Sequence, residues 1–157
     1  MKKFLFFILM AGLTLSSCSK KDENPLVGKW TTDHVNILFK LNGINKSLQQ
    51  EAITSPGAVA LLSMVQLMTM GQVIEFTENQ VLIGGYLVDY TAENGIIYNV
   101  MGGRHDPLFK YKFEGELLVI TSVADENIDM EEIVNALENI FGPGVSDVEP
   151  IMYLKKI

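Results

Sequence analysis

Cysteine, tryptophan and histidine are scarce: the chain of 157 residues has one cysteine, one tryptophan and two histidines. A single cysteine excludes an intramolecular disulfide, so a hydrophobic core and backbone hydrogen bonds must stabilise the fold. It also excludes a zinc site built from several cysteines. The sequence has no Gly-rich phosphate loop and no Gly-x-Ser-x-Gly elbow. We therefore expect no cofactor and no metal.

Positive charge is also scarce, with 12 Lys and Arg against 19 Asp and Glu. Removing Lys2 and Lys3 with an N-terminal leader leaves ten basic residues, so the remaining chain has a net charge of −9. A protein with this charge repels nucleic-acid phosphates and anionic lipid headgroups. We expect no nucleic-acid partner.

No hydrophobic run is long enough for a permanent transmembrane helix. The apolar run 4–15 is about half as long as the roughly 20 residues that a spanning helix needs. Lys2 and Lys3 precede this run, and small residues follow it. This order is typical of a secretory signal peptide.

The stretch Leu15-Ser16-Ser17-Cys18 resembles the lipobox of bacterial lipoproteins. The resemblance implies that residues 1–17 are a signal peptide and that Cys18 carries a diacylglyceryl group. Residues 18–25 are then the lipidated cysteine and a tether. Two or more acyl chains give stable attachment, so the expected partner is the membrane, through lipid on Cys18. The alternative is an ordinary signal peptide with a chance cysteine.

A charged stretch follows the cysteine. Lys21-Asp22-Glu23 resembles the surface-export signal of lipoproteins from Bacteroidota. We therefore expect a lipid-anchored protein of the bacterial outer membrane, with display on the cell surface as a further expectation. The alternative is a solvated tether with no export function.

Residues 26–157 are long enough for one domain with a single core. Short segments rich in β-branched and aromatic residues alternate there with turn residues, which is typical of an antiparallel meander. The predicted strands are 30–41, 73–77, 80–83, 86–92, 96–100, 108–114, 116–122 and 151–156. The last strand is expected to pair with the first and to close the sheet.

The hairpin turns set a register, which places Phe76 opposite Val81 and Tyr111 opposite Leu118. Side chains alternate along a strand, so this register gives the sheet an apolar face and a charged face. The apolar face, predicted to be the interior, holds Ile74, Phe76, Val81, Ile83, Tyr86, Val88, Tyr90, Ile97, Phe109, Tyr111, Phe113, Leu118 and Ile120. Asn99 also points inward in this register.

The segment 52–74 has no charged residue. Its pattern predicts a helix over 58–70 that begins near Pro56 or Gly57. The helix is apolar almost all round, so it is either a buried core helix or a lid over a cavity. In a lid, the flexible side chains of Met64 and Met68 would suit an irregular ligand.

A second helix is predicted over 129–141, where apolar residues follow the i, i+3, i+4, i+7 spacing. Asp129 and Glu132 form a capping-box pattern at its start. Its apolar stripe is expected to pack on the outside of the sheet, over Leu117 and Val119.

The Gly28-x-Trp30 start and the up-and-down order of eight strands resemble the lipocalin-like lipoproteins of Bacteroidota. The resemblance implies a mainly β fold: a lipocalin-like antiparallel barrel of about eight strands over 26–157, with two helical insertions. It also implies that Trp30 closes the narrow end of the barrel. The helix over 129–141 precedes the last strand, whereas lipocalins place theirs after the eighth. An eight-stranded barrel can be filled by side chains or hold one small ligand.

Two polar clusters contain the histidines of the chain, one a candidate for catalysis and the other for metal binding. Arg104-His105-Asp106 lies on a Gly/Pro-flanked loop, but adjacency of the acid and the imidazole is no special geometry. Asp33 and His34 are successive strand residues and are expected to point to opposite faces, so they cannot readily bind one metal ion. A metal site that unites His34 and His105 would require the fold to bring them together. Both are interpreted as ordinary polar residues, and we predict that the protein is not an enzyme.

The leading hypothesis is a binding protein for a small hydrophobic or amphipathic ligand. The wall of the site would be formed by Tyr86, Tyr90, Asn99, Phe109 and Tyr111, with Met64 and Met68 as cover. Asn99 would orient the ligand, or else bond a neighbouring backbone group. The alternative is a cell-surface module with a packed barrel that binds a protein partner.

Overall fold

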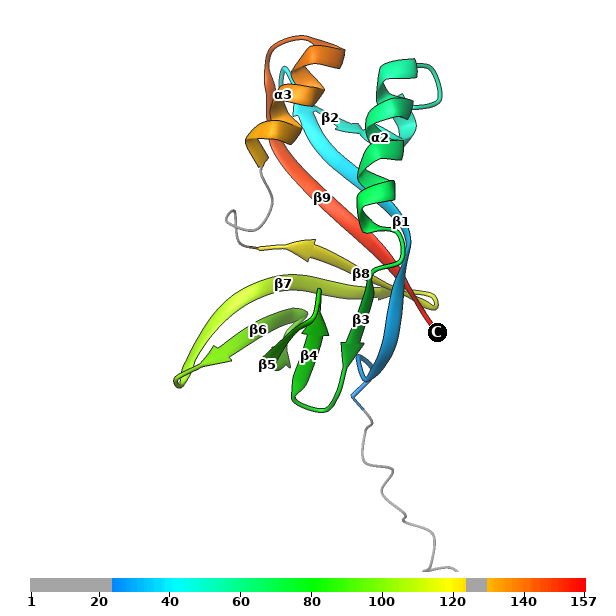
Figure 1. Ribbon diagram of the computed structural model, residues 1–157. Coiled ribbons are helices and arrows are strands. Elements are labelled where there is room, and N and C mark those ends of the chain that lie inside the picture. The colour runs from blue at the N-terminus through cyan, green and yellow to red at the C-terminus, as the bar shows by residue number, and fades with distance from the viewer. Residues whose placement is uncertain (1–23, 124–129) are drawn as a thin grey trace, which may run out of the picture.

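The computed structural model describes residues 24–123 and 130–157. Within these ranges nine antiparallel strands form one sheet, and β1 pairs with β9 to close eight of them into a barrel (Figure 1). The predicted up-and-down barrel is therefore confirmed, including the pairing of the first and last strands. The elements are β1 (Gly28–Leu41), β2 (Ile44–Ser47), α1 (Leu48–Glu51), α2 (Pro56–Thr69), β3 (Val73–Phe76), β4 (Gln80–Ile83), β5 (Tyr86–Glu93), β6 (Ile96–Met101), β7 (Arg104–Glu114), β8 (Leu117–Ser122), α3 (Met130–Phe141) and β9 (Val145–Lys156).

The hairpin register is confirmed in β3–β5, where Phe76 pairs with Val81. It is wrong by two residues in β7–β8, because Tyr111 pairs with Ile120 rather than Leu118. The two-residue turn lies at 115–116, so Glu114 still belongs to the ladder. A shift of two residues keeps every side chain on its face, and the predicted interior is therefore unaffected.

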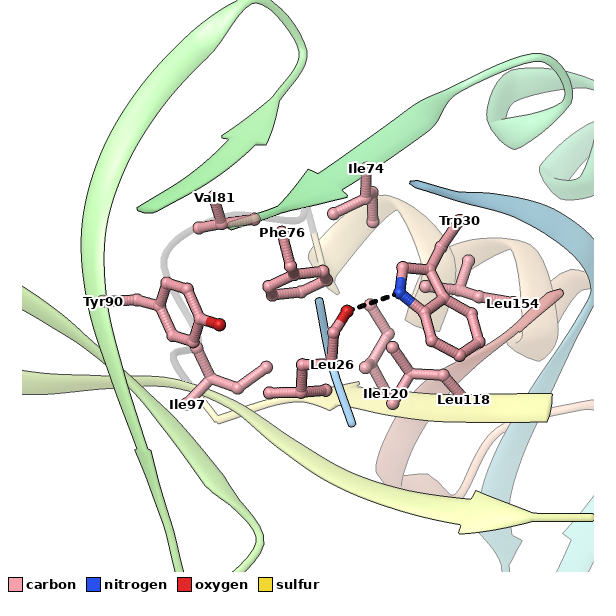
Figure 2. Close-up of a cluster of buried hydrophobic side chains, with 10 residues drawn as sticks. All are labelled: Leu26, Trp30, Ile74, Phe76, Val81, Tyr90, Ile97, Leu118, Ile120 and Leu154. Carbon is pink, nitrogen blue, oxygen red and sulfur yellow. Dashed lines mark hydrogen bonds between the residues drawn. The ribbon is translucent and has the colours of Figure 1, made fainter. Parts of the chain in front are cut away.

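The barrel interior is filled by side chains, which we call the barrel core (Figure 2). Eleven of the thirteen residues predicted to face inward belong to it or pack against it. The inward placement predicted for Tyr86 is wrong, because Tyr86 borders the β4–β5 turn and is 78% exposed. Phe113 is 40% exposed at the rim. The ten buried members are Leu26, Trp30, Ile74, Phe76, Val81, Tyr90, Ile97, Leu118, Ile120 and Leu154.

The strands β1 and β9 continue past the barrel as a ribbon, formed by 35–41 and 145–150, and the short strand β2 pairs with β1 along 38–41 (Figure 1). A β-bulge at Asp33 places one extra residue on β1, between the pairs of Thr32 and His34 with β9. Side chains of a regular strand point alternately to its two faces, and the bulge reverses this alternation. The even-numbered Trp30 therefore faces the barrel core, and the odd-numbered Ile37 faces a second hydrophobic cluster. The bulge explains the irregular alternation of the first strand.

The ribbon carries a second hydrophobic cluster, the helix core, together with α2 and α3. Leu61 of α2 and Leu137 of α3 are buried there against Ile37 and Phe39 of β1. The helix α3 therefore packs on the ribbon and not over Leu117 and Val119, because the ribbon offers an apolar face that no strand of the barrel covers.

The helix α2 begins where the sequence indicates, at Pro56. The hydroxyl oxygen of Ser55 caps it by accepting a hydrogen bond from the backbone N–H of Ala58, at 3.3 Å. A fully buried core helix was the wrong interpretation, since only Ala58 and Leu61 are buried and Leu67 is 71% exposed. The short helix α1 was not predicted.

Residues 1–23 lie outside the described ranges, and so do the predicted lipidation site Cys18 and the capping residue Asp129. Within the described ranges, the structure contains no helix of sufficient length and apolarity to cross a bilayer.

Candidate functional site

One end of the barrel is sealed by the segment before β1. The indole N–H of Trp30 donates a hydrogen bond of 2.7 Å to the carbonyl oxygen of Leu26, and both residues are buried (Figure 2). The hydroxyl of Tyr90 donates to the carbonyl of Thr77 and accepts from the side-chain amide of Asn24, each at 2.9 Å. Trp30 thus closes this end of the barrel.

The opposite end of the barrel faces the helices, and there a cavity of about 420 Å³ lies between the barrel core and the helix core. Phe109, Ile120 and Met152 form its floor and also pack in the barrel core. The full lining is Val35, Asn36, Leu61, Met64, Val65, Met68, Thr69, Phe109, Ile120, Ser122, Glu132, Ile133, Ala136, Pro150, Ile151 and Met152.

Two methionines of α2 border the cavity and are partly open to solvent. Met64 and Met68 line the cavity but remain 47% and 66% exposed. They lie one helical turn apart and therefore on one side of α2. Methionine side chains are flexible and polarisable, so they can adapt to ligands of irregular shape.

Most polar groups near the cavity already serve the fold. The hydroxyl of Thr69 donates to backbone carbonyls of its own helix. Asn36 is 7% exposed, and its side-chain oxygen accepts from the backbone N–H groups of Ile37 at 2.9 Å and Gln49 at 3.1 Å. Its side-chain N–H donates to Ser47 at 3.1 Å. Asn36 therefore fixes the start of α1 on β1.

Three of the seven residues predicted to contact a ligand line this cavity together: Met64, Met68 and Phe109. Their placement matches the predicted cover and one part of the predicted wall. The prediction that they bind a ligand stays a prediction.

The other four residues do not line the cavity. Tyr90 lies in the barrel core, with its ring edge on Phe76 at 5.4 Å, and burial raises the pKa of its hydroxyl. Tyr111 packs against the same core, and Asn99 is half-buried on β6 opposite Tyr90. Tyr86 is exposed beside its turn. The register of the strands predicts only the barrel interior, whereas the cavity is also lined by the ribbon and by both helices.

Thirteen of the sixteen lining residues were not among the predicted site residues, for example Asn36, Glu132, Ile133, Ala136 and Pro150. One usable signal was Asn36, a polar residue between Val35 and Ile37 in an apolar stretch of strand. The others needed knowledge of where α3 packs.

The side chains of Asp33 and His34 contact each other, although they were predicted to point to opposite faces of the strand. The bulge at Asp33 brings its carboxylate to 2.8 Å from Nδ1 of His34, although successive strand residues normally diverge. The ring of His34 stacks on Tyr153 at 4.1 Å, and Lys155 lies 3.4 Å from Asp33. The hydrogen bond from His34 lowers the pKa of the Asp33 carboxyl. In the part of the chain that the structure describes, no group of three His, Cys, Asp or Glu side chains could hold a metal ion.

The second polar cluster lies at the start of β7. Arg104 and Asp106 form an ion pair of 3.4 Å, and Nδ1 of His105 is 3.2 Å from the hydroxyl of Thr91. All three residues of the cluster are exposed, so their interactions contribute little.

Comparison with known proteins gives no family to which the chain can be assigned. No protein-family model matches it, and neither a curated protein nor a solved structure does.

Proposed function

We propose that this protein is a lipocalin-like lipoprotein of the bacterial outer membrane, anchored through Cys18, whose domain binds a small hydrophobic or amphipathic ligand. Its role is binding rather than catalysis. The ligand occupies the cavity between the barrel core and the helix core, not the barrel interior.

The apolar cavity carries this proposal. Its volume of about 420 Å³ lies within the range of roughly 300–1,000 Å³ that is typical of small-molecule sites. Aliphatic, aromatic and methionine side chains form most of its lining. Covering such a lining lowers the free energy because it removes apolar surface from water, so an apolar ligand is favoured over solvent.

A test begins with the protein from the cells that produce it. We expect native mass spectrometry of the mature protein to show an extra mass that leaves on denaturation. The extraction is repeated in two chemically different detergents, because an extra mass that changes with the detergent is not a cellular ligand. A bare protein mass in both detergents contradicts occupancy in the cell.

Binding in solution can be measured on residues 19–157, without leader and lipid. The described residues of the two cores lie within 26–154, so this chain retains them all. We expect the neutral fluorescent probe N-phenyl-1-naphthylamine to bind with a saturable increase in emission.

The site is located by two adjacent residues of α2 that are similarly exposed. Met68 lines the cavity and Leu67 does not, with exposures of 66% and 71%. Met68→Glu places a charge in the apolar wall and is expected to weaken probe binding about fivefold or more, whereas Leu67→Glu leaves it unchanged. Ala136→Phe fills the cavity from α3 and should weaken binding independently. Equal effects at positions 67 and 68 would place the probe elsewhere.

The anchor is tested separately. Because lipid is the only anchor proposed, Cys18→Ala should prevent lipid attachment and cleavage before residue 18, as judged by intact mass. Protease added to intact cells should degrade the domain if the protein is displayed outward. Protection of the domain in intact cells but not in lysed ones would contradict surface display alone.

A second function is supported by the exposed side of α2. Val59, Leu67 and Met70 are large apolar residues that remain exposed, and α2 has no charged residue. Together with the filled barrel, this surface favours a module that binds a protein partner. Loss of a cellular phenotype with Leu67→Glu but not with Met68→Glu would support the partner over the ligand.

A further inference from the structure

The described residues of the cavity lining include an acidic side chain and no basic one. Among the described residues that line it, Glu132 is the only one with an ionisable side chain, and none is Lys, Arg or His. Glu132 is exposed in the first turn of α3. The carboxylate therefore lies where the head group of an amphiphile would remain hydrated while its apolar part rests on the floor of the cavity.

The N-terminus of α3 does not make the site attractive to anions. A helix N-terminus carries a partial positive charge that favours anions. Here the first turn already carries Glu131 and Glu132, whose negative charges offset it. The net charge of −9 on the chain without its leader adds repulsion of anions at longer range.

The volume limits the ligand to a single short chain or a small ring system. A water molecule occupies about 30 Å³ in the liquid, so 420 Å³ accommodates about 14 groups of that size. A chain of about ten carbons with a small head group fits this space, whereas a diacyl phospholipid does not.

From these observations we propose that the cavity selects neutral or cationic amphiphiles over anionic ones, and that Glu132 sets this preference. The inference rests on the proposed function, because it names the class of ligand for the same site. It disfavours fatty acids and other anionic lipids, and it favours alcohols, amines and quaternary ammonium compounds with a short apolar chain.

The test uses residues 19–157 and three amphiphiles with the same chain: decyltrimethylammonium, decanol and decanoate. Each displaces bound N-phenyl-1-naphthylamine at low ionic strength, below its micelle-forming concentration. We expect decyltrimethylammonium to bind about tenfold more tightly than decanoate, equivalent to about 1.4 kcal/mol, with decanol between them. Added salt should reduce the difference, because it screens an exposed charge.

Two neighbouring acids of α3 provide the matched variants. Glu132→Gln should reduce the difference in affinity between cation and anion to about twofold and change decanol binding less than it changes decyltrimethylammonium binding. Glu131→Gln removes the same charge from a residue that does not line the cavity and should have little effect.

The outcomes separate the two proposals. If neither the probe nor any of the amphiphiles binds, the proposed function fails. If all three bind with equal affinity, or decanoate binds most tightly, the function stands and the charge preference is refuted. If Glu131→Gln and Glu132→Gln act equally, the preference arises from overall charge, and the role of Glu132 is refuted.

Discussion

Replacing Trp30 by phenylalanine tests whether the sealed end of the barrel stabilises the domain. Trp30 is 3% exposed, and its indole N–H donates a buried hydrogen bond of 2.7 Å to the carbonyl of Leu26. Phenylalanine keeps an aromatic ring in the core but removes the donor and part of the volume. The carbonyl of Leu26 then lies in the core without this partner.

Two contributions determine the expected loss. A buried carbonyl that loses its donor costs about 1–3 kcal/mol. The smaller ring loses about 1 kcal/mol of transfer free energy, with some addition from the space left behind. The free energy of unfolding should fall by about 3 kcal/mol. For a urea m-value of about 2 kcal/mol/M, the unfolding midpoint falls by about 1.5 M.

The assay is urea unfolding followed by far-ultraviolet circular dichroism, because Trp30 is the only tryptophan and the variant has no indole fluorescence. Lys156→Met is the control. The ammonium of Lys156 lies 5.5 Å from the centre of the Trp30 ring, and an exposed interaction of this kind contributes about 0.5–1 kcal/mol. A loss below 1 kcal/mol for Trp30→Phe, or an equal loss for both variants, would refute the reasoning.

Three further predictions concern other parts of the domain. Burial raises the pKa of Tyr90 because it disfavours the charged form of the hydroxyl. The stability that the neutral Tyr90 contributes is therefore full below the ordinary tyrosine pKa of about 10, and it is lost as the pH rises through the raised pKa. In urea unfolding from about pH 8 to 11, Tyr90→Phe should remove part of the alkaline decline, and Tyr86→Phe should not; equal curves for the two variants would contradict this. Asn36→Leu leaves the backbone N–H of Gln49 without its acceptor and should lower the free energy of unfolding by about 2 kcal/mol, with faster hydrogen exchange in α1; unchanged exchange there would contradict the anchoring role. Leu137→Ala should cost about 2–5 kcal/mol and raise hydrogen exchange in α2 and α3 more than in β4–β6, whereas a uniform increase would show that the two cores unfold together.

The barrel could be predicted from the sequence because its information is local. Two-residue turns and alternation of apolar side chains determine each hairpin, and hairpins that share a strand must agree on one interior face. This consistency survived the two-residue error around Glu114, since Tyr111 and Phe109 stayed on the same face. The prediction for Tyr86 failed because alternation gives the direction in which a side chain points. It does not tell whether a neighbour covers that side chain at the end of a pair of strands.

The cavity could not be predicted in the same way, because it depends on contacts between segments far apart in the chain. Asp33 is one extra residue in β1, and the partner strand that makes it a bulge lies more than a hundred residues later. The bulge turns Ile37 and Phe39 toward the helices, and only then do α2 and α3 find an apolar surface. The methionines of α2 were predicted as a cover from composition alone, without knowledge of what they cover.

The filled barrel and the cavity have one structural cause. The barrel core and the helix core are separate clusters that share only the strands β1 and β9. Each cluster packs well internally, but strands that pass continuously from one to the other hold the two at a fixed separation. The space between them is therefore lined by the outer members of both clusters, such as Ile120 below and Leu61 above. A ligand there contacts both clusters at once, so its binding should stabilise the barrel and the helices together. Lipocalin-like barrels are expected to bind inside the barrel, but in this protein side chains fill that space, and the cavity lies outside it, beside the extended ribbon.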